Sequence, residues 1–257
     1  MKYKIIDVNQ SNIEKYPQAI CFINPKLETF HFKLEWLKKR FKEGLKIKLM
    51  FVEGENKSGK DKLIGFVEYL PGNQVWRAVE ADGYMFIHCL WTNGKKFQHQ
   101  GLGNKLLQEV EKDAKGLQGV AVITSDKAFM ANKSIFLKNN YQPIEESGTE
   151  QLLVKQYKKT ALPKLKKPQN VLGKYQDLTI IYSCQCPWIP RFVQEIEPIL
   201  KKKNLKINIK ELTSAKEAQE TPGIYSTFNL IYKGHLLADR YISTTRFQNI
   251  LKKEKII

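Results

Sequence analysis

Apolar residues recur along residues 1–156 in two rhythms, which predict a mixed sheet with helices packed on it. Spacings of three and four residues predict amphipathic helices over His31–Leu45 and Gly101–Ala114. A short helix is expected over Asn132–Asn139, and Ser11 or Asn12 can cap another. Runs of β-branched and aromatic residues predict strands. These strands are Lys2–Val8, Ile47–Val52, Leu63–Leu70, Tyr84–Trp91, Val120–Thr124, Tyr141–Ile144 and Leu152–Gln156.

A second pattern begins after a lysine-rich stretch and predicts the element order β-α-β-α-β-β-α. Its strands are Leu178–Tyr182, Leu205–Ile209, Tyr225–Tyr232 and His235–Ala238, and its helices are Pro187–Lys203, Ser214–Gln219 and Thr244–Lys252. Lys155–Lys174 holds seven Lys, two Pro and no acidic residue, which is typical of an extended connector. The expected fold class is α/β (α+β), with one domain over 1–156, a basic linker over 157–174 and a second domain over 175–257.

The composition is that of a globular protein, and the net charge of +17 comes mainly from the C-terminal part. Residues 1–150 hold 23 Lys and Arg against 18 Asp and Glu, whereas residues 151–257 hold 20 against 8. No motif of a nucleic-acid-binding protein accompanies this charge, so a lysine-rich solvated surface is the preferred interpretation and nucleic acid is not an expected partner. No apolar run predicts a membrane helix. Four unevenly spaced cysteines and the lack of a secretory signal favour the cytoplasm.

The turn Gln98–Asn104 has the residues of a phosphate-binding loop. It follows a strong strand and opens an amphipathic helix, where several backbone N–H groups point outward and the helix dipole adds positive charge. Glycines at 101 and 103 let a phosphate approach the main chain. A second glycine-rich run, Gly54–Lys60, nearly matches a P-loop. We reject it because Asp61 stands where Ser or Thr is required and because it lies between two predicted strands.

Two motifs together resemble the GNAT superfamily of acetyl-CoA-dependent N-acetyltransferases. The Gln-x-x-Gly-x-Gly run of Gln98–Gly103 is similar to the pyrophosphate loop of that family. Asn132–Tyr141 is similar to its helix with an Asn start, an aromatic centre and a Gly-Phe end, here Asn140-Tyr141. The resemblance covers residues 1 to about 155. It implies a GNAT-type mixed central sheet, acetyl-CoA as cosubstrate and an amine as acceptor.

The resemblance also implies which residues bind the cofactor. The pyrophosphate is assigned to the backbone of Gln98, His99, Gln100, Gly101, Leu102, Gly103 and Asn104. The pantetheine and thioester are assigned to the end of the strand at Cys89, Leu90 and Trp91, where a backbone N–H can polarise the carbonyl. Asn132 is a further candidate contact.

The acid and base are less well marked. Many family members use a Tyr as acid where this chain has Phe136, which has no hydroxyl group. Tyr141 is the nearest aromatic residue, but it falls at a core position of the family. Glu68 is the first candidate base and His88 the second, because both are predicted on strands beside the cofactor cleft. Each could instead be a structural strand residue.

Cys184-Gln185-Cys186-Pro187-Trp188 lies between a strand and a helix and resembles the active-site turn of thioredoxin and glutaredoxin folds. A thiol at a helix N-terminus is stabilised as thiolate, so Cys184 and Cys186 are possible reactive thiols, with Cys186 the more reactive. If Cys186 aligns with the first cysteine of that fold, Ile189 replaces the second and Ser226 replaces its cis-proline. An ordinary disulfide reductase is therefore not expected, and two clustered thiols do not complete a zinc site.

A GNAT domain followed by a thioredoxin-like segment resembles the YoaP-like acetyltransferase family. It implies an enzyme that moves an acetyl group from acetyl-CoA to an amine of unknown identity by direct transfer. Two alternatives stay open at this point. One is a thiol-redox or thiol-binding protein whose GNAT-like half only binds CoA. The other is a non-catalytic acyl-CoA sensor, which the lack of a hydroxyl at Phe136 favours. The sequence does not give the oligomeric state.

Overall fold

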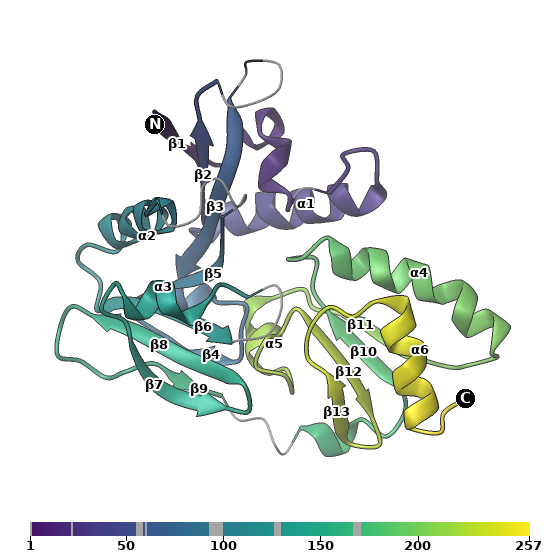
Figure 1. Cartoon of the computed structure of the whole chain (residues 1–257). Helices are drawn as coiled ribbons and strands as arrows, with labels where there is room; N and C mark the ends of the chain where they lie inside the picture. Colours follow the sequence, from purple (N-terminus) through teal and green to yellow (C-terminus); the bar gives the residue numbers. More distant parts are fainter. Residues whose placement is uncertain are drawn as a thin grey trace. The chain divides into compact units, whose positions relative to one another are not determined.

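The computed structural model describes residues 2–21, 23–54, 59, 61–92, 100–125, 130–166 and 171–257. The chain divides into two compact units, and both are discontinuous in sequence. The first unit consists of 1–22, 37–75 and 80–165. The second consists of 23–36, 76–79 and 166–257, so two short segments of the N-terminal half belong with the C-terminal residues. Each unit has its own sheet (Figure 1).

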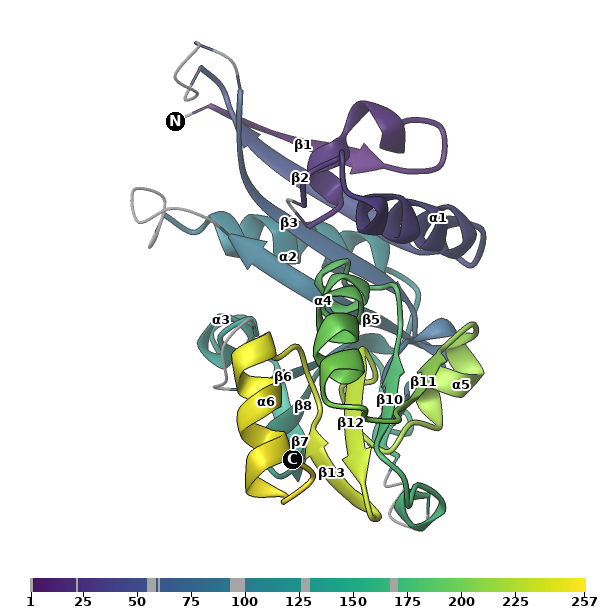
Figure 2. The ribbon, with the colours of Figure 1, turned by 90° about the vertical axis from the view of Figure 1, so that its right-hand side faces the viewer.

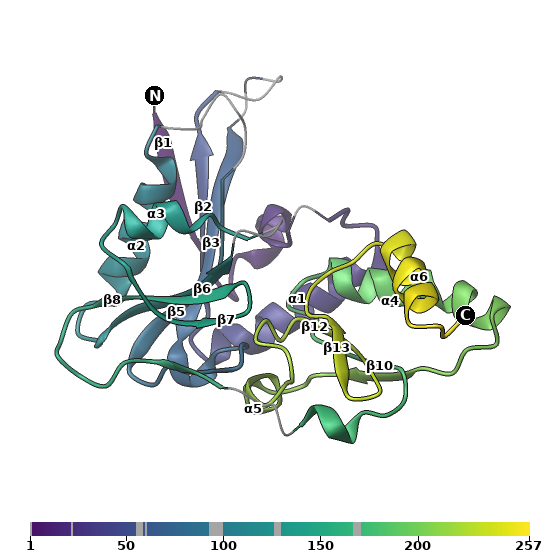
Figure 3. The same cartoon turned by 60° about the horizontal axis from the view of Figure 1, so that its bottom comes forward.

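The first unit is built on a seven-stranded sheet of order β1-β2-β3-β5-β6-β8-β7. All neighbouring strands are antiparallel except β5 and β6, which are parallel. Figure 3 shows the β7–β8 hairpin extending the sheet beyond β6. The strands are β1 (Tyr3–Val8), β2 (Lys46–Val52), β3 (Lys62–Pro71), β5 (Tyr84–Thr92), β6 (Gly119–Ser125), β7 (Gln142–Ser147) and β8 (Glu150–Gln156).

Helix α2 (Leu102–Asp113) supplies the core of the first unit. Its buried face holds Leu102, Leu106, Leu107 and Val110, at the helical spacing that the sequence predicts. These side chains pack with the apolar residues of β2, β3, β5 and β6 in one cluster. Helix α3 (Lys133–Leu137) adds Phe136 to the same cluster. The predicted helices and strands of this half are confirmed, with small shifts at their ends.

The helix expected to be capped by Ser11 or Asn12 is the exception. Two short 3-10 turns, η1 (Ile13–Lys15) and η2 (Pro17–Ala19), stand in its place. The side-chain oxygen of Asn12 accepts a hydrogen bond from the N–H of Asn9 and caps no helix. Pro17 starts the second turn, because it lacks the N–H that a continuing helix would need.

The second unit has a four-stranded sheet of order β11-β10-β12-β13. Strands β10 (Thr179–Tyr182) and β11 (Asn208–Glu211) are parallel, and β12 (Phe228–Tyr232) is antiparallel to both β10 and β13 (His235–Ala238). Figure 2 shows α4 (Trp188–Lys202) and α6 (Thr244–Lys253) over one face of this sheet, and Ile180, Phe192, Phe228 and Phe247 form their common core. With α5 (Ala215–Gln219), the order β-α-β-α-β-β-α is confirmed.

The remaining elements are short or shared. Helix α1 (Glu28–Lys42) starts earlier than predicted and spans the boundary at residue 36. The basic stretch after β8 contains β9 (Lys164–Leu165) and η5 (Leu172–Lys174). The loop between β3 and β5 contains η3 (Gly72–Gln74) and β4 (Val79–Glu80). No described helix meets the length and apolarity that a membrane span requires.

Candidate active site

Strands β5 and β6 separate in the middle of the first unit's sheet. Their parallel register runs from Tyr84 to Ile87 on β5 and from Gly119 to Val122 on β6. Both strands continue beyond that point, β5 to Thr92 and β6 to Ser125. The candidate thioester residues Cys89, Leu90 and Trp91 all lie on the part of β5 beyond this register. A slot between two diverging strands exposes backbone polar groups to a ligand, since each non-proline residue carries one donor and one acceptor.

β5 bulges at His88, where this separation begins. Glu68 of β3 lies opposite Cys89 and Tyr69 lies opposite Ile87, so the register skips His88. An extra residue bends a strand and changes the direction of its side chain. The bulge brings Nδ1 of His88 within 3.3 Å of Oε1 of Glu68. Both side chains are buried, with 0% and 3% exposed. The two residues that the sequence suggested as alternative bases are therefore direct neighbours.

The Gly101 turn leaves the start of α2 open. Gly101 is the N-cap residue, it has φ 71°, and no side chain caps the helix. A Cβ on Gly101 would meet nothing within 4 Å, and the first turn contains no acidic residue. The first N–H groups of a helix need outside partners and carry partial positive charge. This turn can therefore receive an anion. Gln98 and His99, which the sequence also assigned here, lie outside the described residues.

Gly103 and Asn104 hold α2 against α3. A Cβ on Gly103 would stand 2.5 Å from Cδ1 of Ile135, so a larger residue there would displace the end of the Ile135 side chain. Oδ1 of Asn104 accepts a hydrogen bond from Nδ2 of Asn139 at 3.1 Å. Oδ1 of Asn132 caps α3 by accepting from the N–H of Ser134 at 2.8 Å. A contact from Asn132 to a cofactor would therefore come from its Nδ2.

Phe136 and Tyr141 both lie in the core. Each is 0% exposed, and their rings meet edge to face with centroids 5.5 Å apart. Burial raises the pKa of Tyr141 well above its usual value, and the nearby Glu111 carboxylate raises it further. Tyr141 thus occupies the core position that its place in the motif suggested.

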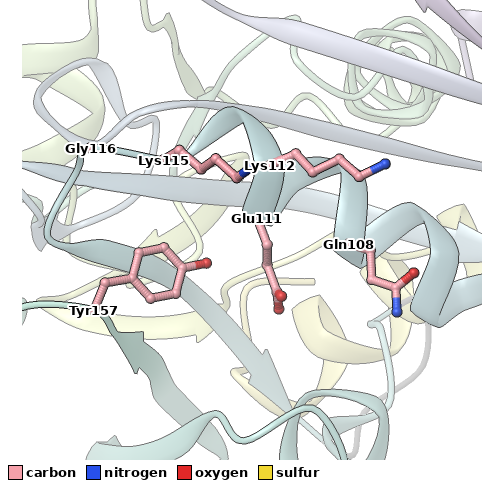
Figure 4. Close-up of a pocket in the computed structure, with 6 residues that line it drawn as sticks. All are labelled: Gln108, Glu111, Lys112, Lys115, Gly116 and Tyr157. Carbon is pink, nitrogen blue, oxygen red and sulfur yellow. The ribbon is translucent and has the colours of Figure 1, made fainter.

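A cavity of about 520 Å³ lies at the other end of α2 (Figure 4). Its lining residues are Gln108, Glu111, Lys112, Lys115, Gly116 and Tyr157. Glu111 is paired with Lys155 at 2.8 Å, and burial together with this carboxylate raises the pKa of Tyr157 to about 12. None of the site residues suggested by the sequence lines this cavity.

The two thiols of the second unit have different surroundings. Cys184 is buried, and its thiol donates a hydrogen bond to Oε1 of Glu211 at 3.1 Å. Cys186 is half-buried and precedes Pro187, the N-cap residue of α4, whose start has no side-chain cap. A neighbouring carboxylate favours the protonated thiol, whereas a helix start favours the thiolate. None of the four cysteines is in a disulfide.

Sequence reasoning missed two polar partners of this turn, Arg77 and Glu211. Gln185 is 5% exposed and accepts a hydrogen bond from Nη1 of Arg77 at 2.5 Å. Arg77 comes from the loop between β3 and β5, and no sequence pattern links it to a residue more than a hundred positions away. Glu211 is the last residue of β11, and no sequence pattern distinguished its carboxylate from those of other acidic residues. Among the described residues, no group of three or more His, Cys, Asp and Glu could hold a metal ion.

Comparison with known proteins finds a family model that matches part of the first half and a relative that matches nearly the whole chain. Residues 18–134 match the model described as "Acetyltransferase (GNAT) family". The chain is 26% identical over 255 residues to a protein of Bacillus subtilis (strain 168) named "Uncharacterized N-acetyltransferase YoaP", and the match covers 96% of this chain and 97% of that protein.

Solved structures match a smaller part of the chain. The PaiA N-acetyltransferase of Thermoplasma acidophilum, in complex with coenzyme A, has 16% identity and a TM-score of 0.39 over 61% of this chain and 100% of its own. An acetyltransferase of Thermus thermophilus has 15% identity and a TM-score of 0.43 over 61% of this chain and 98% of its own.

Proposed function

We propose that the chain moves an acetyl group from acetyl-CoA to an amine. The residues that we assign to this reaction are those of β5, the Gly101 turn and the Glu68–His88 pair. The match of residues 18–134 to the GNAT acetyltransferase family supports the proposal. One observation supports this proposal most strongly. The bulge that joins His88 to Glu68 lies where β5 leaves β6. This position supports His88 as the proton acceptor beside the open edge of β5.

The residues present fit the cofactor. Its pyrophosphate needs several N–H donors in a small space, and the uncapped start of α2 at Gly101 offers them. Each hydrogen bond to a charged oxygen contributes about 1.5–3 kcal/mol. The pantetheine chain is apolar and amide-containing, which suits the edge of β5 at Cys89–Trp91. Leu102 and Gly103 begin the helix, and Gln100 precedes the turn. Asn132 can donate from its Nδ2.

The cosubstrate supplies the acetyl group as a thioester. The chain's own residues supply three things. A backbone N–H of Cys89–Trp91 donates to the carbonyl oxygen, where negative charge develops. Nε2 of His88 takes the proton of the attacking amine, because Oε1 of Glu68 faces Nδ1 and favours the proton there. Burial of both side chains limits the access of water to the pair itself.

The pair is tested by a double-mutant cycle. We expect His88→Gln to lower turnover about a hundredfold or more, the usual contribution of a general base. Glu68→Gln should lower it less, because it only orients the ring. The double variant should be no slower than His88→Gln, since the carboxylate acts through the imidazole. CoA release over a panel of amines measures turnover, and calorimetry checks that acetyl-CoA affinity is kept.

His31→Gln is the matched control, because His31 is an exposed histidine on α1. It should keep normal turnover. Additive losses in the double variant, or normal turnover in His88→Gln, would show that the base lies elsewhere. An unchanged rate of CoA release with every amine would contradict acetyl transfer itself.

For the chain as a whole, we propose a GNAT domain over 1–156, a basic linker over 157–174 and a thioredoxin-like domain over 175–257. The compact units differ from these bounds, since 23–36 and 76–79 group with the C-terminal residues and 157–165 with the first unit. The strand order β11-β10-β12-β13 with a parallel first pair supports the last assignment. Cysteines outside disulfides fit a reducing compartment, so we place the protein in the cytoplasm. Thiol chemistry at Cys184 and Cys186 is a second candidate function, which the uncapped helix start beside Cys186 favours. The acceptor amine is left open.

A further inference from the structure

The second unit gathers several segments at the end of its sheet where β10 and β11 begin. α4 joins these two parallel strands, so it returns the chain from the end of β10 to the start of β11. The N–H of Asn208 donates to the carbonyl of Leu178 at 2.9 Å, beside the start of both strands. The N–H of Gly234, in the β12–β13 turn, donates to the carbonyl of Tyr175 at 2.8 Å. The end of α4 and this turn therefore lie at the same end of the unit.

α6 ends at this end of the unit as well. Figures 1 and 3 show its last turn, next to the letter C, on the same side of the unit as the end of α4. Figure 2 shows it at the lower edge of the unit, together with the β12–β13 turn. Six exposed lysines belong to these two helix ends, and we call them the lysine cluster: Lys202, Lys203, Lys206, Lys252, Lys253 and Lys255. Within 201–206 and 252–255, Glu254 is the only acidic residue. The fold thus brings together two lysine runs that are separate in sequence.

The lysine cluster lacks the ion pairs that cations elsewhere in the unit make. Among the described residues, none of its six side chains takes part in an ion pair or a side-chain hydrogen bond. Elsewhere in the unit, carboxylates neutralise cations at 2.8 to 3.0 Å, in the pairs Arg191–Glu195, Lys210–Glu217 and Arg240–Asp239. Unpaired charges of one sign repel each other and create a positive potential that attracts polyanions. The cluster is therefore a candidate surface for a polyanionic partner.

A fluid lipid surface fits this cluster better than a nucleic acid does. All six cations are lysines, which carry a compact, strongly hydrated charge on a flexible stem, whereas arginine offers the rigid fork that suits fixed phosphate groups. The sequence has no nucleic-acid-binding motif to accompany them. Ile257 is 36% exposed, lies two residues after Lys255 and adds an apolar side chain that can enter the headgroup region. Lysines grouped in this way are typical of surfaces that adsorb to anionic lipids.

We propose that the lysine cluster binds anionic lipid headgroups and holds the protein at a membrane surface without a spanning helix. Each lysine close to an anionic leaflet strengthens adsorption about fivefold. Salt screens exposed charges, so the binding weakens as ionic strength rises. The proposal uses the second unit alone, and it does not depend on the proposed acetyl transfer.

The experiment is sedimentation of the full chain with vesicles of phosphatidylcholine that contain about one third phosphatidylserine, at about 0.1 M salt. We expect the protein to sediment with these vesicles, to stay in solution with pure phosphatidylcholine, and to be released at about 0.5 M salt. The triple variant Lys202→Gln, Lys206→Gln, Lys253→Gln should bind at least about thirtyfold more weakly. Thermal unfolding checks that this variant is folded, which is expected because all three side chains are exposed.

The matched control removes the same charge from exposed lysines of the first unit, in the triple variant Lys42→Gln, Lys115→Gln, Lys159→Gln. Its binding should fall less than about threefold, because these lysines lie outside the cluster. Equal losses in the two triple variants would show that net charge and not the cluster attracts the vesicles, and would overturn the proposal.

A DNA duplex of about 20 base pairs tests the other polyanion. Tighter binding to the duplex than to the anionic vesicles, lost in the Lys202, Lys206 and Lys253 variant, would assign the cluster to nucleic acid and overturn the lipid proposal. A native protein that stays in solution with the anionic vesicles would overturn it as well. CoA release by the same variants should stay normal, so a failure of the proposed acetyl transfer is seen separately from a failure of lipid binding.

Discussion

The starts of helices α2 to α6 fall into two groups, and the difference separates structural turns from candidate chemical ones. α3, α5 and α6 begin with Asn132, Ser214 and Ser243, and each side chain accepts a hydrogen bond from an N–H of its own helix. α2 and α4 begin at Gly101 and Pro187 without a side-chain cap. At a capped start, one backbone N–H of the helix is already bonded to a side chain, which stabilises the helix. An uncapped start keeps its N–H groups for a ligand or a charged sulfur, at a cost in intrinsic stability.

The two uncapped starts differ in what they leave open. The Gly101 turn has no side chain, so a phosphate can reach the backbone itself. At α4, proline removes one N–H, and the residue before it is Cys186. The nearest candidate for the dipole to act on is therefore an atom of the chain, the Cys186 sulfur. The first turn therefore suits a diffusible anionic cosubstrate, and the second suits a reactive thiol.

Among changes at the helix starts, the largest effect is expected from Gly101→Glu. The side chain would fill the open turn, repel a pyrophosphate and strain a backbone at φ 71°. Acetyl-CoA affinity should fall at least about tenfold, or about 1.4 kcal/mol, as measured by calorimetry.

Gly116→Glu is the control for backbone strain in that comparison. Gly116 has φ 92°, and a Cβ there would also meet nothing within 4 Å, but it follows the C-terminal end of α2. It should lose stability and keep affinity. Equal affinities for the Gly101 variant and the native chain would refute the pyrophosphate assignment.

The sequence predicted the helices and strands well, because residues close in sequence determine where these elements begin and end. The Gly101–Ala114 helix was expected one residue longer at each end than α2. α3 ends sooner than expected, because Asn140 adopts φ 66° and the N–H of Tyr141 returns to the carbonyl of Phe136. The strand expected at Leu205–Ile209 was misplaced towards the N-terminus. Leu205 and Ile207 are apolar because they pack on the core of the second unit, while β11 itself is Asn208–Glu211.

Contacts between residues that are distant in sequence could not be predicted from such local signals. Glu68 and His88 were named separately, and their pairing depends on a bulge that shifts the register at one position. No local pattern marks such a bulge. The Arg77–Gln185 bond joins a loop of the N-terminal half to the thiol turn. Its formation follows from tertiary packing, which the sequence does not reveal by periodicity.

Ser243→Ala should have an intermediate effect, which is confined to the free energy of unfolding. Oγ of Ser243 accepts from the N–H of Arg246 at 3.1 Å, and loss of such a cap costs about 1 kcal/mol. Thr245→Ala is the control, because Thr245 is exposed in the same turn and is not the cap residue. Urea unfolding measures both. If the two variants were equally stable, a capped start would bring no advantage, and the contrast with α2 and α4 would lose its energetic basis.

The smallest effect is expected from Glu217 at the start of α5, where cap and carboxylate support each other. The N–H of Glu217 donates to Oγ of Ser214 at 3.2 Å, and its carboxylate accepts from the N–H of Thr213 at 2.8 Å. The Thr213 N–H and then Lys210 lower the pKa of Glu217 from 4.5 to about 2. Because the folded-state pKa lies below the unfolded one, the stabilisation is complete above about pH 4.5 and is lost as the pH falls towards 2.

Glu217→Gln should therefore remove part of the stability difference between pH 5 and pH 3, by less than about 1 kcal/mol because solvent screens a partly exposed carboxylate. Thermal unfolding at the two pH values measures it. Glu197→Gln is the comparison, since Glu197 makes only an exposed pair with Lys201 on α4, at 2.8 Å, and should change the pH dependence less. A larger effect from Glu197 would mean that side-chain pairs outweigh the backbone cap, and that capped and uncapped helix starts differ less in this protein than their hydrogen bonds indicate.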